Sequence, residues 1–189
     1  MDTKQKLKHL TPNLREKLAS LVKDIEENIS VLYELATHDE KTGIYNYRFF
    51  QNMLDMEFEK AKRGKPLSLL IIDIDYFKKI NDKFGHLTGD KILLQSAKII
   101  KNNTRKSDIA ARFGGEEFLV LLPNTNISKA KRVAERIRRA VEKNLKKYSV
   151  TISGGIACYK KGYSKEKLKQ RADKALYKAK EKGRNRIEI

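Results

Sequence analysis

The sequence RKSDIAARFGGEEFLVLL, residues 105–122, contains two short apolar runs separated by two glycines and two glutamates. The runs are strand-like, and a Gly-Gly pair can adopt the positive φ angles of a tight turn without steric cost, so the stretch predicts a β-hairpin. Gly114 and Gly115 are expected in the turn, with Glu116 and Glu117 at the hairpin tip. Because two like charges this close repel each other, we expect a ligand to make their placement favourable.

A second acidic feature ends the apolar run LSLLIIDID at residues 67–75. The length and isoleucine content of this run predict a strand that is buried on both faces. If the strand pairs beside the hairpin, Asp73 and Glu116 converge at one edge of the sheet. Clustered carboxylates are costly unless a cation neutralises them, and all-oxygen ligands suit a hard ion such as Mg²⁺. The alternative is a solvated hairpin tip whose acidic residues are incidental.

The apolar periodicity of the whole chain predicts an α+β fold. The order of elements from residue 67 onward is β-α-β-β-α-β-α-β, which indicates an α/β sandwich: a central mixed sheet that includes the β-hairpin and is covered by helices. Residues 1–36 carry apolar residues at steps of three and four and predict an N-terminal helical segment, either a linker or a dimerisation helix. Residues 37–189 are expected to form a separate α+β domain. Helices are expected at 47–63, 89–103, 126–148 and 164–183, and further strands at 148–157 and 186–189.

The composition fits one domain with a hydrophobic core, since the chain has 189 residues and 40% of them are hydrophobic. No run of about 18 apolar residues is present, so no transmembrane span is expected. The first ten residues, MDTKQKLKHL, lack the apolar stretch of a signal peptide. One cysteine cannot form an internal disulfide, which favours a reducing cytoplasm.

The net charge of +18 arises from 42 basic and 24 acidic residues. A positive field of this size attracts polyanions such as nucleic acid, nucleotides and acidic membrane surfaces. A composition rich in Lys, Glu and Ile is also common in proteins from hot environments. The charge alone therefore selects no function.

Five blocks of the sequence, in order, resemble the motifs of the GGDEF family, the diguanylate cyclases. The first departs from the family pattern D-x-L-T-G-L-x-N-R by having Lys41 and Ile44 in place of leucine and Tyr47 in place of arginine, and another has Gly154 where an apolar residue is usual. The resemblance covers about residues 36–189. The blocks are HDEKTGIYNYRFF (38–50), DIDYFKKINDKFGHLTGDKIL (73–93), RFGGEEF (112–118, the GGEEF form), TISGGIA (151–157) and RADKALYKAKEKGRN (171–185).

The resemblance implies a fold like the palm of nucleotidyl cyclases and polymerases, and the conversion of two GTP into cyclic di-GMP and two pyrophosphates. It implies a homodimer and two divalent ions per active site, Mg²⁺ or Mn²⁺, which suit an in-line displacement at phosphorus. By position, Asp73, Glu116 and Glu117, with the Ile74 carbonyl, resemble the metal ligands. Glu116 and Glu117 also resemble the catalytic acids, and Glu117 either binds the second ion or helps to deprotonate the 3′-hydroxyl.

The guanine pocket implied by the resemblance contains Asn81 and Asp90. A carboxylate can accept hydrogen bonds from guanine N1–H and the 2-amino group, and adenine lacks this pair of donors. His86 lies between the two and resembles a pocket residue, although the sequence alone favours a structural role. Gly114 and Gly115 resemble the glycines that leave space for GTP against the backbone.

The phosphate side of the site, again by resemblance, includes Phe77, through its backbone N–H, and Lys78. Lys180 and Arg184 are four residues apart, so we expect them to share a face at a helix end and to reach the triphosphate together. A solvated basic cluster at the C-terminus is the alternative for this pair.

An R-x-x-D pattern, Arg105 and Asp108, precedes the GGEEF sequence. It resembles the family's inhibitory product site, in which Arg binds phosphate or stacks on guanine and Asp reads the guanine edge. Arg136 resembles the additional arginine of that site. We expect these residues at the far end of the strand from the hairpin tip. The alternative is a surface salt bridge between Arg105 and Asp108.

Two other functions remain open from the sequence. A degenerate family member would bind cyclic di-GMP and catalyse nothing, although the intact acidic set argues against it. A basic nucleic-acid-binding module is suggested by the segment 129–147, which has nine Lys or Arg and two Glu. No helix-turn-helix, zinc-finger or RNA-binding motif accompanies this segment, so nucleic acid is not expected as a partner.

Overall fold

The computed structural model describes residues 11–189, so the first ten residues of the predicted N-terminal segment lie outside the described part. The chain divides into two compact units, with the boundary between Thr37 and His38. The first unit contains helix α2 (Pro12–Thr37). Its apolar residues, such as Ile25 and Leu32, are exposed. Among the described residues, this apolar stripe is therefore not part of a hydrophobic core.

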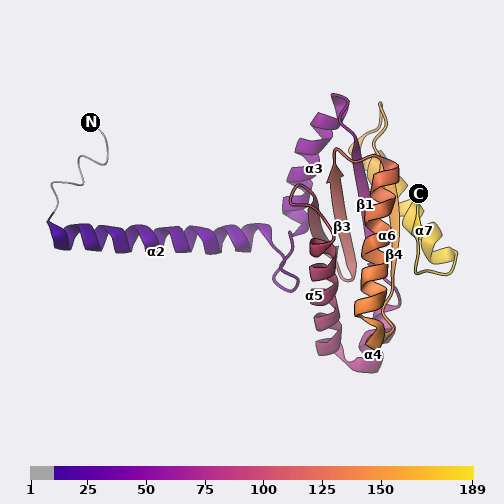
Figure 1. Ribbon diagram of the computed structural model, residues 1–189, viewed down its shortest axis with the longest axis horizontal. Helices are drawn as coiled ribbons and strands as arrows, with labels where there is room; N and C mark the ends of the chain where they lie inside the picture. Colours follow the sequence, from indigo (N-terminus) through magenta and orange to yellow (C-terminus); the bar gives the residue numbers. More distant parts are fainter. Residues whose placement is uncertain (1–10) are drawn as a thin grey trace. The chain divides into compact units, whose positions relative to one another are not determined.

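The second unit, residues 38–189, is an α/β sandwich in which helices cover both faces of a five-stranded sheet (Figure 1). The strand order is β2-β3-β1-β4-β5, and every neighbouring pair is antiparallel except β4 and β5, so the sheet is mixed. The predicted α+β class is confirmed, with β1 at the centre. The strands are β1 (Leu67–Ile74), β2 (Ile109–Gly114), β3 (Glu117–Pro123), β4 (Ile152–Cys158) and β5 (Ile187–Glu188).

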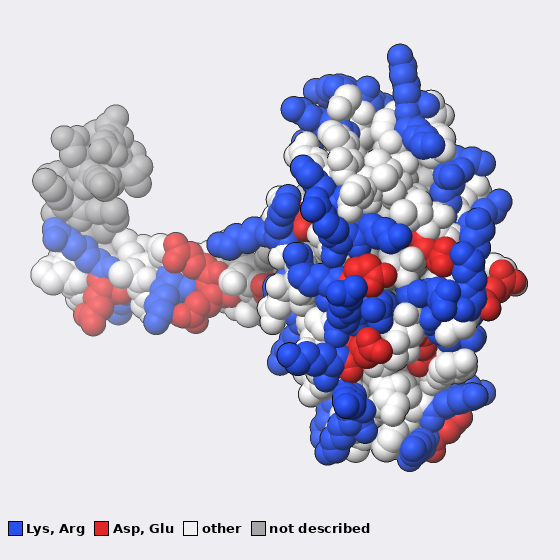
Figure 2. All heavy atoms as spheres, turned by 45° about the vertical axis from the view of Figure 1, so that its right-hand side comes forward, with Lys and Arg blue, Asp and Glu red and all other residues white. Residues whose placement is uncertain are grey.

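Five α-helices and one short 3₁₀ helix accompany the sheet in this unit. Among residues 11–189, no helix is long and apolar enough to cross a membrane. Lys and Arg side chains cover much of the visible surface of this unit, with acidic side chains among them (Figure 2). The helices are α3 (Tyr47–Lys62), α4 (Phe77–Phe84), α5 (His86–Asn102), α6 (Ile127–Asn144), η1 (Lys146–Tyr148) and α7 (Lys165–Glu181).

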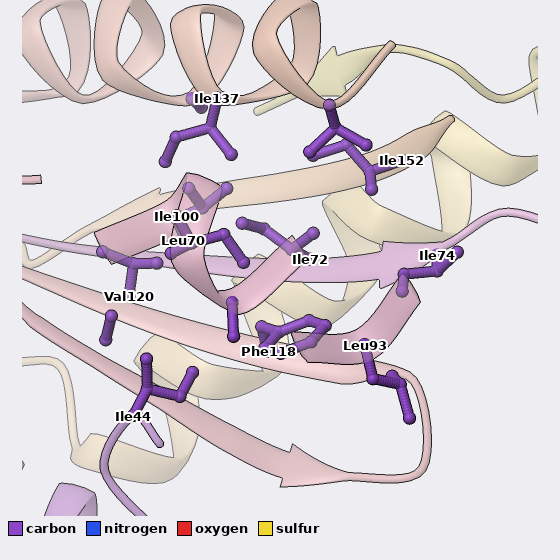
Figure 3. Packing of buried hydrophobic residues seen from close by; sticks show 14 of the residues in the cluster. Ile44, Leu70, Ile72, Ile74, Leu93, Ile100, Phe118, Val120, Ile137 and Ile152 are labelled. Carbon is purple, nitrogen blue, oxygen red and sulfur yellow. The ribbon is translucent and has the colours of Figure 1, made fainter. Parts of the chain in front are cut away.

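The central strand β1 is buried along its whole length, as its continuous apolar run predicts. Leu70, Ile72 and Ile74 point to one face, where they pack with apolar residues of α4, α5 and α6 (Figure 3). Leu69 and Ile71 point to the other face and pack with residues of α3 and α7. Alternation along one strand thus supplies both hydrophobic cores and fixes the direction of the side chains that follow.

Some element boundaries differ from the sequence prediction. Helix α4 was not predicted, because eight residues are too short for a clear helical period, and the residue before it, Tyr76, has a φ of 56°. The predicted helix 126–148 ends at Asn144 and continues as the 3₁₀ helix η1. The strand predicted to start at residue 148 starts at Ile152, after Ser149 takes a φ of 55°.

The hairpin turn is shifted by one residue from the predicted position. Gly114 pairs with Glu117, so the two turn residues are Gly115 and Glu116. Gly115 has a φ of 50°, a conformation that favours glycine, whereas Gly114 belongs to β2. The expectation of positive φ at both glycines is therefore wrong, because Gly114 is the last paired residue of its strand.

Strand β4 approaches α7 so closely that Gly155 has no room for a side chain. A Cβ atom there would lie 2.1 Å from both the Ala172 carbonyl oxygen and the Leu176 amide nitrogen. A Cβ atom at the neighbouring Gly154 would instead meet a side-chain atom of Ile187, at 2.7 Å. One glycine thus faces helix backbone, and the other faces the movable end of a side chain.

We expect Gly155→Ala to lower the free energy of unfolding by about 3 kcal/mol and Gly154→Ala by about 1 kcal/mol, because overpacking costs more where backbone must move. Denaturant unfolding of the two variants beside the parent measures the difference. Equal losses at the two positions would contradict the close contact between β4 and α7.

Candidate active site

Three acidic residues predicted from the sequence lie at one end of the central strands. Asp73 of β1 is directly opposite Glu117 of β3 in the antiparallel register. The backbone N–H of Ile74 donates to the Glu116 carbonyl oxygen at 3.3 Å, which holds the hairpin turn against the end of β1. The predicted convergence of β1 with the hairpin tip is found. Because directly paired residues point to the same face, the Asp73 and Glu117 side chains are neighbours.

The electrostatics of this end of the sheet show an excess of negative charge. Burial raises the pKa of Asp73, and the carboxylates of Glu116 and Asp75 raise it further, against the lowering effect of Lys180. Burial, followed by the Asp73 carboxylate, raises the pKa of Glu117. The Lys180 Nζ atom lies 2.7 Å from Asp73 Oδ2. The ammonium group of Lys180 therefore partly compensates the negative charge of several carboxylates.

The chemistry of these donors fits a divalent cation. The carboxylates of Asp73, Glu116 and Glu117 and the carbonyl of Ile74 are oxygen donors, which hard cations prefer. Across residues 11–189, no three His, Cys, Asp or Glu side chains are gathered closely enough to hold an ion as they stand. Asp73 is instead paired with Lys180. Burial is the main cause of the raised pKa values of Asp73 and Glu117, and neighbouring carboxylates add to it against the lowering effect of Lys180.

The hairpin turn is held by Arg112, which the sequence reading did not single out. Its guanidinium donates to the Gly115 carbonyl oxygen from Nη2 at 2.7 Å and from Nε at 3.1 Å. Its Nη1 atom also lies 3.2 Å from Asp39 Oδ1. Asp39 in turn accepts hydrogen bonds from the Thr42 amide and hydroxyl at 3.0 and 2.6 Å. The loop before α3 and the turn beside the carboxylates are therefore connected through one arginine.

Asp75 is a second structural residue that sequence reasoning missed. Its side chain is buried and accepts hydrogen bonds from Thr151 Oγ1, Ser153 Oγ and the Asn185 backbone amide at 2.7, 2.6 and 3.1 Å. These bonds fasten the segment after α7 to the end of β1. The D-x-D spacing of Asp73 and Asp75 was the available signal, since the first acid is the penultimate residue of β1 and the second follows the strand.

The segment after α7 places Arg184 differently from the prediction. Helix α7 ends at Glu181, and Gly183 and Arg184 both have positive φ, 102° and 63°. The expectation that Lys180 and Arg184 share a helical face is wrong, because the chain leaves the helix between them. Arg184 lies over the Tyr76 ring at 4.4 Å and donates to its hydroxyl at 3.1 Å. Both basic residues nevertheless contact the C-terminal end of β1 and the residues just after it.

The start of α4 offers backbone donors near this end of the sheet. The first intrahelical bond runs from the Ile80 amide to the Tyr76 carbonyl at 3.2 Å, so the amides of residues 77–79 precede the hydrogen-bonded ladder. The Phe77 ring is buried in the core, and Lys78 is exposed. Free amides at a helix N-terminus favour anions, which fits the predicted phosphate side.

Asn81 and Asp90, the residues predicted to bind guanine, lie on the consecutive helices α4 and α5, which pack together at Gly89. A Cβ atom at Gly89 would lie 1.8 Å from Asn81 Oδ1, so α5 packs directly on that side chain. Asn81 Oδ1 is buried, and no hydrogen-bond partner for it exists in the described part of the chain. Asp90 follows Gly89 and bonds to Lys41 through both carboxylate oxygens. His86 is exposed at the first residue of α5.

Arg105, Asp108 and Arg136 line one hollow of about 310 Å³ at the far end of β2 from the hairpin turn. Asp108 Oδ2 accepts from the Arg105 backbone amide at 2.8 Å, and Arg136 Nη2 donates to the Asn103 carbonyl at 2.6 Å. Burial raises the pKa of Asp108, against the lowering effect of the two arginines. The carboxylate is thus engaged by backbone, in contrast to the surface salt bridge considered from the sequence.

Residues 36–186 match the family model described as diguanylate cyclase, GGDEF domain. Over 200 residues the chain is 43% identical to Diguanylate cyclase A of Treponema denticola, an alignment that covers 100% of this chain and 53% of the relative. Over 172 residues it is 41% identical to Response regulator PleD of Caulobacter vibrioides, with 86% of this chain and 38% of the relative covered. The chain thus spans about half of one relative and less than half of the other.

The fold resembles the solved coiled coil and GGDEF domain of DgcB from Caulobacter crescentus in complex with c-di-GMP. The TM-score is 0.83 with 34% sequence identity, and the match covers 93% of this chain and 98% of that chain. The family match extends over most of the sequence and contains the carboxylate cluster and both predicted guanine readers. The chain therefore belongs to the diguanylate cyclase GGDEF-domain family.

Proposed function

We propose that this chain condenses two GTP molecules into cyclic di-GMP and two pyrophosphates. The observation that carries the proposal is the pairing of Asp73 with Glu117 at the end of the central strands, beside the glycine turn. Asp73 is buried, Glu117 is half-buried, and both carboxyl groups have raised pKa values. Such a pair beside a hairpin turn is expected where a site binds a cation with a phosphate ligand. The family membership supports GTP as the source of that phosphate.

In each condensation step, a ribose 3′-oxygen forms a bond to an α-phosphorus, and the bond from that phosphorus to pyrophosphate breaks. The 3′-hydroxyl proton leaves to a base, and we assign this role to Glu117, a half-buried carboxyl group opposite Asp73 whose pKa is raised by burial. Asp73, Glu116 and Glu117 with the Ile74 carbonyl would hold divalent cations, two Mg²⁺ or Mn²⁺ per site, which supply charge neutralisation at the phosphates.

Positive groups of the chain complete the phosphate side of the proposed site. Lys180 is the ammonium nearest the carboxylates, and Arg184 is oriented by its contact with Tyr76. The amides at the start of α4, including that of Phe77, precede the first helical hydrogen bond and follow closely after the end of β1, so they are further candidate donors to phosphate. Lys78 is exposed nearby and can reach the outer phosphates. These groups bind and orient the triphosphate so that pyrophosphate leaves opposite the attacking 3′-oxygen.

A homodimer supplies the second GTP. One active site binds one GTP, so the condensation requires two copies of the chain that face each other. The exposed apolar stripe of α2 supports association with a second copy through that helix. The solved DgcB structure that resembles this chain is described as a coiled coil with a GGDEF domain, which also supports a paired helix.

We expect incubation of the protein with GTP and Mg²⁺ or Mn²⁺ to give cyclic di-GMP, identified by mass. Glu117→Gln should lower the turnover by about 100-fold or more, since general acid–base groups contribute on that scale. Glu59→Gln, a change of the same kind on the exposed face of α3, is the control and should leave the rate unchanged.

Absence of a cyclic dinucleotide at every metal concentration would contradict the proposal. Saturable binding of added cyclic di-GMP without turnover would then indicate a receptor. Salt-dependent binding of unrelated DNA with no GTP binding would indicate a nucleic-acid module.

The raised pKa of Glu117 predicts a pH-dependent gain in stability for Glu117→Gln. The folded pKa lies above the ordinary value of 4.5, so the folded state is penalised at pH values above both and is not penalised below the ordinary value. In a metal chelator, the variant should therefore have the higher Tm at pH 8, and the difference should vanish as the pH falls below about 4. An identical Tm at pH 8 would show that the carboxylate is not destabilised by its surroundings.

Arg105, Asp108 and Arg136 are proposed to bind the product and inhibit the enzyme. Arg105→Ala should leave the initial rate unchanged and raise the final product level, because product binding no longer limits turnover. Progress curves of the variant, the parent and the control Arg63→Ala measure this. If parent and Arg105→Ala slow at the same product concentration, the hollow is not an inhibitory site.

A further inference from the structure

An ion pair joins the loop before α3 to the proposed guanine pocket. The Lys41 Nζ atom lies 2.9 Å from Asp90 Oδ1 and 3.1 Å from Oδ2, although the residues are 49 positions apart in the sequence. The two side chains are 57% and 47% exposed, so ligand can reach them. Lys41 is also one of the two positions at which a leucine of the motif pattern is replaced, and it is the one at which the replacement is charged. The lysine therefore introduces a charge beside a predicted base-reading carboxylate.

Lys41 projects from a loop that is held in place on both sides. The next residue, Thr42, is buried and bonds through its amide and hydroxyl to Asp39 Oδ1. The amides of Gly43 and Asp39 bond to the carbonyls of Asp39 and Ile44, both at 2.8 Å, and Ile44 is buried in the core. Exposed ion pairs between two mobile side chains contribute little to stability. Here the backbone of Lys41 is fixed, so less conformational entropy is lost when its ammonium group takes one position.

The surroundings of Asp90 contain complementary hydrogen-bonding groups. Asn81 Oδ1 lies against Gly89, the residue before Asp90. It is buried and accepts no hydrogen bond from any of the described residues. Asp90 supplies two carboxylate oxygens, and Lys41 supplies an ammonium with three N–H donors. The Watson–Crick edge of guanine presents one acceptor, O6, followed by two donors, N1–H and the 2-amino group. The exposed pair of Lys41 and Asp90 thus supplies a donor and acceptors of the kinds this edge requires.

We propose that Lys41 is a specificity-determining residue that donates a hydrogen bond to guanine O6, an inference that rests on the proposed function. When Asp90 accepts from N1–H and the 2-amino group, O6 lies beside the carboxylate oxygen that faces N1. The ammonium donates to both Asp90 oxygens; with guanine bound, it would donate to one of them and to O6. Leucine at this position has no donor for O6. Adenine presents an amino group there, which would face the ammonium donor to donor.

Binding of diphosphates tests this assignment, because GDP cannot condense. The probes are GDP, 6-thio-GDP, in which sulfur replaces O6, and inosine diphosphate, which keeps O6 but lacks the 2-amino group. Calorimetric titrations with Mg²⁺ compare the parent with Lys41→Met, which keeps the length of the side chain, and Lys41→Arg, which keeps donors. Lys91→Met on the exposed side of α5 is the control for the lost charge.

We expect the parent to prefer GDP over 6-thio-GDP by about tenfold, the effect of one hydrogen bond to a charged group in a partly solvated site. Lys41→Met should bind GDP about tenfold more weakly and bind the two nucleotides almost equally. The ratio of GDP to inosine diphosphate should not change, because the 2-amino group contacts Asp90. Lys41→Arg should restore the preference, and Lys91→Met should behave as the parent.

Failure of this inference and failure of the proposed function give different results. Equal binding of GDP and ADP by the parent would overturn the guanine pocket and, with it, the proposed function. A parent that prefers GDP, and that loses this preference in Asp90→Asn, upholds the pocket. If Lys41→Met then keeps the parent's ratio of GDP to 6-thio-GDP, or binds GDP more tightly, Lys41 does not read O6 and the inference is wrong.

Discussion

The antiparallel pairing of β1 with β3 is the constraint on which the site depends. It places Asp73 directly opposite Glu117 and brings the Glu116 carbonyl to the Ile74 amide. The backbone ladder and the two cores fix this register, because a shift by one residue would move the side chains of β1 that pack in one core into the other core. The folding free energy of the sheet therefore holds the two carboxyl groups together against their own repulsion. The raised pKa values and the contact with Lys180 are consequences of that arrangement.

Two further side chains extend this constraint to the loops. Arg112 connects the Gly115 carbonyl of the hairpin turn to Asp39, and Asp75 connects the end of β1 to the segment after α7. Both are polar groups with several partners, and Asp75 is buried, so the loss of one partner leaves the others unsatisfied. Loops that carry the proposed binding groups are thereby attached to the rigid sheet, as the proposed binding of a triphosphate in one orientation requires.

The sequence predicted those parts of the molecule that follow from the spacing of apolar residues along the chain and from the residues that favour turns. The continuous apolar run that ends in acidic residues at 67–75 and the Gly-Gly sequence were sufficient to predict a buried strand beside a hairpin with acidic residues at its tip. Helix α4, the bonds of Asp75 and the partner of Lys41 were not predictable, because each depends on a contact between distant residues or on a very short element. The position of Arg184 was missed for a backbone reason, since positive φ at a non-glycine residue has no sequence signal of its own.

The distance between the two predicted ligand sites limits how one could affect the other. Strand β2 has six residues and spans about 20 Å between Asp108 and the hairpin turn. It is paired along β3 in a close-packed sheet, so a ligand beside Asp108 has no small local movement by which to displace Glu117. A product bound there can inhibit a two-copy reaction more directly, by holding the copies in an arrangement in which their GTP sites do not meet. Inhibition of this kind requires that the product-bound and the condensing arrangements exclude each other, while the active site of each copy remains intact.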